Sequence, residues 1–274
     1  MDRSLGTLVR AALASAALVV ATTALATAQP EPFKITNIHF ETNASACDMG
    51  IQMSFDTDGI TEGEVLSPDG QVVLSIQAVP GLEETDDLTE MFHERVEPPI
   101  TDLIDALGCE PDEDAISLAE LFDAWPEGVY EFEGESDDTE FEGGAELTHR
   151  IPAGPKILAP RDGAIVPHDK TLLIRWRRVN GPLLPELGPV EIVGYHVVIA
   201  DVTDPVLAPG QTKTQFDADV DQRENRFRVA RQFLRPNRIY EFEVLATEEH
   251  GNQTITEGGV FCTPPITPED CEAP

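Results

Sequence analysis

The feature that most constrains the fold of this chain is a strict alternation of apolar and acidic residues in two distant segments. In Tyr130–Glu135 (YEFEGE) aromatic residues and glycine alternate with glutamate, and Ile239–Ala246 (IYEFEVLA) repeats the period of two. Successive side chains of a β-strand point to opposite faces, so this period gives one apolar face and one charged face. The pattern therefore predicts antiparallel strands that each have one face buried and one face in water.

The acidic segment 131–144 (EFEGESDDTEFEGG) raises the question of whether its carboxylates bind a metal ion. Alternation places six glutamates on one face, with a turn at 136–139: Glu131, Glu133, Glu135, Glu140, Glu142 and Glu146. Like charges that face one another across a strand pair repel, and calcium would relieve this repulsion. Calcium ligands usually come from a loop that wraps the ion, however, and the D-x-D-x-D-G loop pattern is absent. We expect a solvated acidic face, with specific calcium binding as the alternative.

The first 28 residues have the pattern of a secretory signal peptide. Arg3 and Arg10 precede an apolar stretch, Ala11–Leu25. The small residues at 26–28 (Ala-Thr-Ala) then form a cleavage site. The stretch is short for a bilayer span, and no later segment is long enough to be one. We therefore expect a mature chain that begins at Gln29, is periplasmic or extracellular, and has no membrane span after signal cleavage.

The distribution of charge predicts a domain boundary near residue 152. The formal net charge of −33 is incompatible with nucleic-acid binding. Counted along the sequence, residues 29–152 hold 32 acids against Lys34, Arg95 and Arg150, whereas residues 153–274 hold 18 acids against 13 bases. The change coincides with Ile151–Pro155 (IPAGP), a turn-forming linker. We expect an acidic β-rich domain at 29–152, a second domain at 156–263 and a carboxy-terminal tail at 264–274.

The four cysteines are expected to form two disulfides, because their number is even and the chain carries a signal peptide. Three connectivities are possible for Cys47, Cys109, Cys262 and Cys271. We favour Cys47–Cys109 with Cys262–Cys271, since each pair then lies within one expected domain or its tail. Zinc binding is the competing interpretation, but no C-x-x-C pair is present.

The carboxy-terminal half reads as short strands separated by proline- and glycine-containing turns. Strands are expected at Thr171–Trp176, Gly194–Ala200 and Ile239–Ala246. The segment Leu234–Arg238 (LRPNR) makes a corner just before Tyr240, whose hydroxyl can then hydrogen-bond to the upstream backbone. Trp176, Tyr195 and Tyr240 are therefore the expected core anchors of this half.

This half resembles a fibronectin type III domain over roughly residues 156–263. The resemblance rests on Trp176 late in the second strand, Tyr195 in the third, the L-x-P-x-x-x-Y-x-F-x-V-x-A spacing of residues 234–246, and Gly251. It implies a seven-strand antiparallel sandwich used for adhesion, spacing or recognition, and rarely for catalysis. The chain departs from the family pattern in a longer proline-rich segment, Gly181–Pro189, and in the Cys262–Cys271 tail.

The one concentration of basic residues lies between residues 226 and 238: Arg226, Arg228, Arg231, Arg235 and Arg238. Alternation within an edge strand explains them as solvated side chains. The functional alternative is docking onto the acidic first domain or onto an acidic polymer.

The amino-terminal half is expected to combine strands with a short helical insertion. Strands are expected at 33–42, 50–55, 64–67 and 71–79, and the insertion covers about 85–125, with helices at 86–95, at 100–107 and from Ser117 onward. Ser117 and Glu120 form a capping box. Leu118, Leu121, Phe122 and Trp125 then share one helical stripe, which makes Trp125 a core anchor.

Together these patterns predict a mainly β fold with two tandem β-sandwich domains of immunoglobulin or fibronectin type III type, the first with the helical insertion. No catalytic motif accompanies them. His93–Glu97 (HERVE) lacks the second histidine of a zinc-protease helix, and no G-x-S-x-G, phosphate or dinucleotide loop is present. We therefore expect neither an enzyme nor a bound cofactor.

The expected function is a non-enzymatic exported binding or spacer module whose partner is an extracellular or periplasmic protein or glycan. The segments 122–135 (FDAWPEGVYEFEGE) and 140–160 (EFEGGAELTHRIPAGPKILAP) resemble exported bacterial proteins that pair such a domain with a fibronectin-like one. That resemblance implies an architecture and no activity. Two alternatives stay open, a calcium-stabilised structural or adhesion protein and a glycan-active hydrolase with an appended fibronectin-like module.

Overall fold

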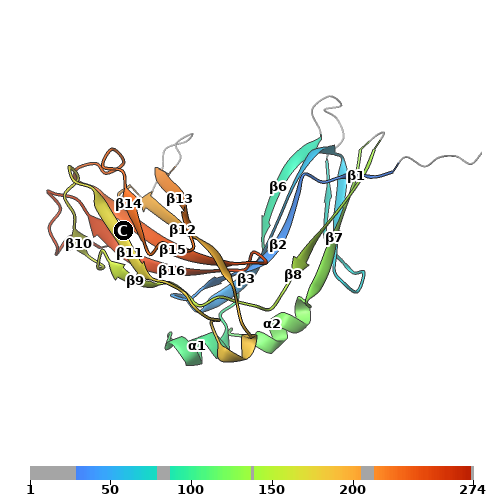
Figure 1. Cartoon of the computed structure of the whole chain (residues 1–274), viewed down its shortest axis with the longest axis horizontal. Coiled ribbons are helices and arrows are strands. Elements are labelled where there is room, and N and C mark those ends of the chain that lie inside the picture. The colour runs from blue at the N-terminus through green and yellow to red at the C-terminus, as the bar shows by residue number, and fades with distance from the viewer. Residues whose placement is uncertain (1–28, 79–86, 137–138, 205–212, 273–274) are drawn as a thin grey trace, which may run out of the picture.

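The computed structural model describes residues 29–78, 87–136, 139–204 and 213–272, so the signal peptide expected at 1–28 and the centre of the turn at 136–139 lie outside it. These residues form a mainly β structure (Figure 1). The strands are β1 (Glu31–Pro32), β2 (Ile35–Asn43), β3 (Asp48–Ile60), β4 (Glu62–Leu66), β5 (Val72–Gln77), β6 (Leu88–Glu94), β7 (Gly128–Glu135), β8 (Glu140–Leu147), β9 (Lys156–Ala159), β10 (Ala164–Ile165), β11 (Leu172–Arg177), β12 (Ile192–Asp201), β13 (Gln215–Asp221), β14 (Arg226–Val229), β15 (Ile239–Glu248) and β16 (Gln253–Cys262). The helices are α1 (Thr101–Leu107), α2 (Leu118–Ala124) and the 3-10 turn η1 (Pro185–Leu187).

The strands form three sheets, one of which runs through both halves of the chain. This long sheet has the order β13-β12-β15-β16-β2-β3-β6, with β10 pairing β16 off the path. The small sheet, β1-β8-β7-β4-β5, covers the amino-terminal part of the long sheet, and the third sheet, β14-β11-β9, covers its carboxy-terminal part. Each half is therefore a β-sandwich, and both sandwiches use the same long sheet.

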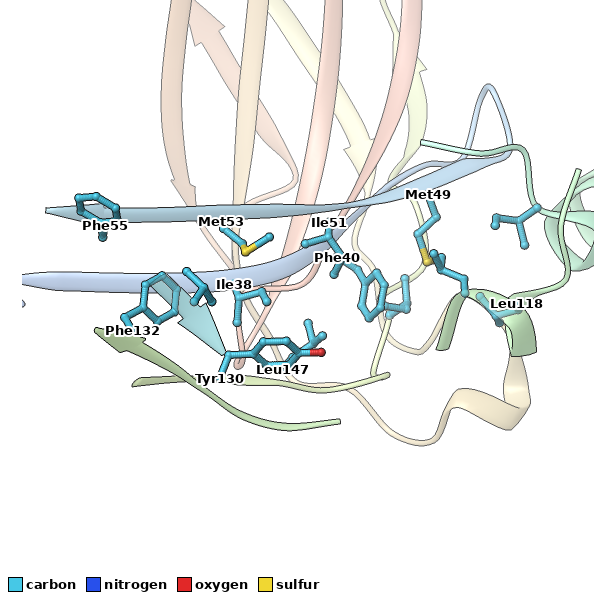
Figure 2. Packing of buried hydrophobic residues seen from close by; sticks show 14 of the residues in the cluster. Ile38, Phe40, Met49, Ile51, Met53, Phe55, Leu118, Tyr130, Phe132 and Leu147 are labelled. Carbon is cyan, nitrogen blue, oxygen red and sulfur yellow. The ribbon is translucent and has the colours of Figure 1, made fainter. Parts of the chain in front are cut away.

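Two separate hydrophobic cores lie on the same side of the long sheet. Alternate residues of β2 and β3 point into the first core, where they meet Tyr130, Phe132 and Leu147 of the small sheet (Figure 2). The second core contains Trp176, Tyr195, Val197, Phe242 and Phe261. The alternation in segments 130–135 and 239–246 thus forms strands with one buried face, as the sequence predicts.

The described residues of the first half form two short helices rather than the three expected. Ser117 caps α2, and its side chain and that of Glu120 form the capping box. The helix expected at 86–95 is wrong, because residues 88–94 form the edge strand β6 (Asp86 itself lies outside the described residues). β6 pairs with β3 so that Met91 and His93 lie on the core side, opposite Phe55 and Met53. Pairing with an open sheet edge outweighs the local helical spacing of this segment.

The second half has the strand order of a fibronectin type III sandwich. Four strands, β13-β12-β15-β16, face three strands, β14-β11-β9, around the second core. The Tyr240 hydroxyl accepts a hydrogen bond from the Arg235 backbone N–H (2.8 Å) and donates one to the Phe233 carbonyl (3.4 Å). This is the expected tyrosine corner, and it fixes the chain reversal before β15.

The two halves are joined by direct strand pairing and by a buried asparagine. β16 pairs with β2 in parallel over Gln253–Ile255 and Glu41–Asn43. Asn252 is 1% exposed; its Oδ1 accepts from the Phe40 N–H (2.9 Å), and its Nδ2 donates to the Thr148 and Arg150 carbonyls (3.0 and 3.1 Å). One side chain of the second half therefore satisfies three backbone groups of the first half.

The proline-rich segment Gly181–Pro189 also belongs to this junction. Leu183 donates its backbone N–H to the Ile151 carbonyl (2.9 Å), and Leu184 is buried in the first core although it belongs to the second half. The departure from the fibronectin type III pattern thus has a structural role, since the longer segment crosses the boundary and covers the neighbouring core.

The cysteines form two disulfides, Cys47–Cys109 and Cys262–Cys271. The first ties the β2–β3 turn to the segment after α1. The second ties the carboxy-terminal tail to the end of β16, where Ile165, Ile239 and Ile266 pack around it.

Candidate functional site

The face of the long sheet that points away from both cores is strongly acidic. Residues paired across neighbouring strands point to the same side, so the register places these side chains on one continuous face. We call it the inner face, because it lines the opening between the two arms that diverge from the β16–β2 junction, with β13 on one arm and β6 on the other (Figure 1). Its carboxylates are Glu41, Asp48, Asp56, Glu90, Glu94, Glu97, Asp217, Asp219, Asp221, Glu241, Glu243 and Glu257.

Three of these carboxylates, which we call the junction cluster, converge beside the β16–β2 junction. Ligand oxygens of Glu41 in β2, Glu94 in β6 and Glu97 just after β6 all lie within 4.8 Å of one another. A Cβ atom at Gly50 would lie 2.5 Å from the Glu97 Cγ, so the glycine leaves the space in which this side chain lies over the sheet. Asp48 and Glu97 each have one buried oxygen without a hydrogen-bond partner among the described residues.

The pKa values of Glu41, Glu97 and the neighbouring Asp48 are raised because these carboxyl groups are partly buried and close to like charges. Burial raises the pKa of Glu41 to about 7, and the charges of Glu94 and Glu243 act in the same direction. Burial, followed by the charge of Asp48, raises the pKa of Glu97 to about 7. Burial also raises the pKa of Asp48. The cluster thus brings together carboxyl groups whose ionised form is not stabilised by a nearby positive charge.

The neighbouring histidine does not supply a counter-charge. His39 lies on the inner face in β2 and is only 8% exposed, and burial lowers its pKa to about 4. It is therefore neutral at physiological pH. The cluster of Glu41, Glu94 and Glu97 could hold a divalent cation or the positively charged group of a partner, since both interact favourably with convergent carboxylates.

A cavity of about 610 Å³ opens on the second-half arm of the same face. Val198, Ala200 and Val260 form an apolar floor, and carboxylates dominate the walls: Asp162, Glu241, Glu243, Glu257 and Glu272. Burial, followed by the charge of Glu257, raises the pKa of Glu243. Lys213 is the basic residue of the lining, 4.0 Å from a Glu241 oxygen. The cavity has the shape and charge for a cationic group on an apolar stem.

A second group of potential metal ligands has a structural role. Glu248 ends β15, and Glu249 and His250 lie in the turn that leads to β16. Glu248 is fully buried, and its Oε1 accepts from the backbone N–H groups of His250 (3.0 Å) and Asn252 (3.1 Å). These bonds hold the turn that positions Asn252 at the junction. The Glu248 carboxylate therefore already accepts hydrogen bonds from the backbone.

The acidic hairpin of the sequence analysis lies on the opposite side of the molecule from the inner face. Six exposed glutamates form two rows across β4, β7 and β8 of the small sheet: Glu62, Glu135 and Glu140 in one, and Glu64, Glu133 and Glu142 in the other. We call this set the glutamate ladder. Within the described residues no three of its carboxylates converge as those of the junction cluster do. Whether calcium binds there stays a prediction to be tested.

The arginine-rich segment does not dock onto the acidic first half. Arg226 and Arg228 are exposed on the edge strand β14, and Arg238 pairs with Asp201 and Asp204 of its own half. The described ion pairs between the halves are Arg150 with Glu249 at 3.4 Å and His250 with Glu146 at 4.0 Å, and neither involves this segment. The arginine-rich segment therefore does not dock onto the first half of its own molecule.

The four expected core anchors occupy different environments. Trp176, Tyr195 and Tyr240 are almost fully buried in the second core, and the Tyr195 hydroxyl accepts from the Val179 backbone N–H (2.8 Å). Trp125 is only partly buried at the margin of the first core. The Arg95 guanidinium lies 5.6 Å from the centre of its ring.

Sequence reasoning missed the junction cluster, the cavity and Asn252. Their residues come from segments around positions 41, 94, 243 and 252, which carry no common motif. The alternation of Glu241 and Glu243 shows which face they share, but only the β16–β2 pairing places that face beside Glu41.

The sequence matches no family model and no curated protein. Among solved structures, domains A168–A170 of titin match at 14% identity and a TM-score of 0.26, over 82% of this chain and 60% of that chain. Domains FN1–FN3 of chicken CNTN1 match at 10% identity and a TM-score of 0.28, over 84% of this chain and 68% of that chain.

A two-domain fibronectin type III segment of chicken tenascin matches at 11% identity and a TM-score of 0.26, covering 83% of this chain and 97% of that chain. The fibronectin type III-like fold of the second half accordingly rests on its own strand order. Neither helix among the described residues has the length and apolar character that crossing a bilayer requires.

Proposed function

We propose that this chain is a non-enzymatic, exported binding or spacer module that acts in the periplasm or outside the cell. The observation that carries the proposal is the junction, where one sheet continues from a fibronectin type III-like sandwich into a second sandwich. The division at 29–152 and 156–263, with a tail at 264–274, is part of this proposal. In this proposal each half is a folding unit, although the two halves share the long sheet.

The junction supports a module that presents a surface in a fixed orientation. Strand pairing, the buried Asn252 and the crossing segment Gly181–Pro189 all resist rotation of one half against the other. A surface that is ordered before binding loses less conformational entropy when a partner arrives. The inner face spans this junction, so a fixed angle between the arms keeps its carboxylates in register.

The chemistry of the inner face favours a partner that carries positive charge. Glu41 and Glu97 have raised pKa values, and Glu97 and the neighbouring Asp48 each have a buried oxygen with no hydrogen-bond partner among the described residues. The adjacent cavity has an apolar floor. A lysine or arginine side chain of a protein, or an amino group of a glycan, would satisfy both features. We propose such a group as the part of the partner that the inner face recognises.

Export is tested by the amino terminus of the protein recovered from cell fractions. The proposal expects the mature chain in the periplasmic or medium fraction. Its first residue should be Gln29, and non-reduced peptide maps should show both disulfides. Recovery of the protein in the cytoplasm, with Met1 retained and free thiols, would contradict it.

Binding is tested with two variants that remove the same charge from different faces. Glu41→Gln with Glu243→Gln alters the inner face, and Glu133→Gln with Glu142→Gln alters the glutamate ladder. Calorimetric titration with an oligolysine peptide should show at least about tenfold weaker binding for the first variant, about 1.4 kcal/mol or more, and little change for the second. Equal losses in both variants would mean that the peptide senses net charge and not the inner face.

Two further measurements separate the proposal from its alternatives. Calcium that binds with defined stoichiometry and raises the melting temperature at matched ionic strength would favour a calcium-stabilised structural protein. Release of reducing sugar from a panel of polysaccharides, abolished by Glu243→Gln, would show that the cavity is catalytic and that the non-enzymatic proposal is wrong.

A further inference from the structure

The outer face of the third sheet is basic, in a chain whose net charge is −33. Its exposed cations are Lys156 in β9, Arg175 and Arg177 in β11, and Arg226 and Arg228 in β14. We call these five residues the basic face. Arg175 lies directly opposite Arg226, and Arg177 lies opposite Lys156. Such like-charge pairs are unfavourable, and none of the five makes an ion pair within the described part of the chain.

The glutamate ladder has the same lattice of charges with the opposite sign. On both faces the charged side chains sit on neighbouring strands, about 5 Å apart, and on alternate residues along each strand, about 7 Å apart. The basic face has two such rows, Arg175 with Arg226 and Arg177 with Lys156. The ladder has two rows of three glutamates over a hollow of about 370 Å³.

Each face also carries an exposed apolar side chain. Leu158 in β9 is 40% exposed on the basic face, and Val129 in β7 is 55% exposed beside the ladder. An interface between them would thus have an apolar contact within its charged surroundings, as protein interfaces usually do.

One molecule cannot bring its own two faces together. The basic face covers the second core and the ladder covers the first core, and they lie on the far sides of the two arms (Figure 1). The junction fixes the arms, so complementary charges are available only from another molecule. A contact between two different patches on identical subunits is heterologous, and it continues from copy to copy unless it closes into a ring.

We propose that the basic face of one copy of this chain docks on the glutamate ladder of a second copy, so that the protein assembles head to tail. This contact is separate from the inner face, and it goes beyond the binding or spacer function proposed above. Electrostatic complementarity would supply orientation, because each cation row then lies over a carboxylate row. The remaining charge of each copy opposes association over longer range, so the assembly requires salt to screen it.

Two charge-reversal variants test the contact. Arg177→Glu with Arg226→Glu destroys the basic face and leaves each new carboxylate opposite a remaining cation, Lys156 or Arg175. Glu133→Lys with Glu142→Lys destroys the ladder. Arg223→Glu with Arg231→Glu is the matched control, since both arginines are exposed outside the basic face. Circular dichroism and melting curves check the fold, and Arg→Gln and Glu→Gln versions of the same pairs replace any variant that does not fold.

Sedimentation velocity of the chain without residues 1–28 measures the assembly at about 0.15 M salt, where the Debye length is about 8 Å. The unmodified protein and the control should show a mass that rises with concentration beyond that of a dimer. Either face variant alone should be monomeric, with at least about tenfold weaker association. An equimolar mixture of the two face variants should give one-to-one dimers and nothing larger, because only one intact face remains on each.

The proposal is overturned if the unmodified protein stays monomeric at every salt concentration, if the control loses association as the basic-face variant does, or if the mixture stays monomeric. Heparin or polyglutamate that binds a monomeric wild-type protein, and loses affinity only with the basic-face variant, would identify an acidic polymer as the occupant instead. Either result leaves the inner-face titration unaffected, so this inference and the proposed function can fail independently.

Discussion

The carboxyl cluster at the junction makes the stability of this protein depend on pH in an unusual direction. The pKa of Glu41 is about 7, compared with 4.5 for an ordinary glutamate. At 1.36 kcal/mol per pH unit this interval corresponds to at most about 3 kcal/mol. Glu41 is partly exposed, so solvent screening reduces the expected effect to about 1–2 kcal/mol.

The sign follows from the form that the folded state prefers. A raised pKa means that folding favours the protonated carboxyl group, so the folded state binds more protons than the unfolded state between pH 4.5 and about 7. The contribution to stability is therefore complete below pH 4.5 and is lost as the pH rises to 7. Glu97, whose pKa is also about 7, adds to the same slope.

The perturbation that isolates this effect is Glu41→Gln. Glutamine is uncharged at every pH and keeps an oxygen that can accept the hydrogen bond from Gln253. We expect the variant to be more stable than the unmodified protein by about 1–2 kcal/mol at pH 8, which is about 2–8 °C in melting temperature for a chain of this size. At pH 4 the two proteins should have nearly equal stability.

Urea denaturation of both proteins between pH 4 and pH 8 measures the two slopes. The control is Glu133→Gln, which removes the same charge from the exposed ladder and accounts for the general effect of net charge. The reasoning is refuted if Glu41→Gln keeps the full pH slope of the unmodified protein, or if it destabilises the protein at pH 8.

Three other outcomes can be checked on the same protein. Tyr240→Phe should cost about 1 kcal/mol in urea denaturation, because the Arg235 N–H loses its buried acceptor, and no loss would count against the corner. Asn252→Ala should cost about 3 kcal/mol or more, because it leaves three backbone groups at the junction, two of them buried, without their partner; a loss below 1 kcal/mol would contradict the role of Asn252 in joining the halves. Glu133→Gln with Glu140→Gln should raise the melting temperature at low salt, and sodium chloride should raise the melting temperature of the unmodified protein smoothly. A one-to-one calcium binding isotherm that is lost in this variant would show a specific calcium site instead.

The sequence by itself determined the features that depend on near neighbours. A period of two fixes which side of a strand is apolar, and for this reason Tyr130 and Phe132 are buried while Glu131 and Glu133 are exposed. The capping box at Ser117 and the corner before Tyr240 are set by residues three to seven positions apart. These interactions need only the local chain geometry, so their residue types can be read directly.

Tertiary structure decided the features that need a partner from far along the chain. Residues 88–94 have a spacing compatible with a helix, but β3 offers an open edge whose backbone groups must be paired, and the segment becomes a strand. Segment Gly181–Pro189 is in sequence only a longer proline-rich segment, yet Leu184 is buried in the core of the other half. Neither choice is encoded within the segment itself.

The candidate site shows the same division. The sequence shows that Glu41, Glu94 and Glu243 are each acidic, but the raised pKa of Glu41 depends on its burial and on the charges of the other two. That proximity arises because β16 pairs with β2 across more than two hundred residues of chain. Strand register between distant segments is selected by the packing of both cores and by hydrogen bonds such as those of Asn252, and no local pattern of residues specifies it.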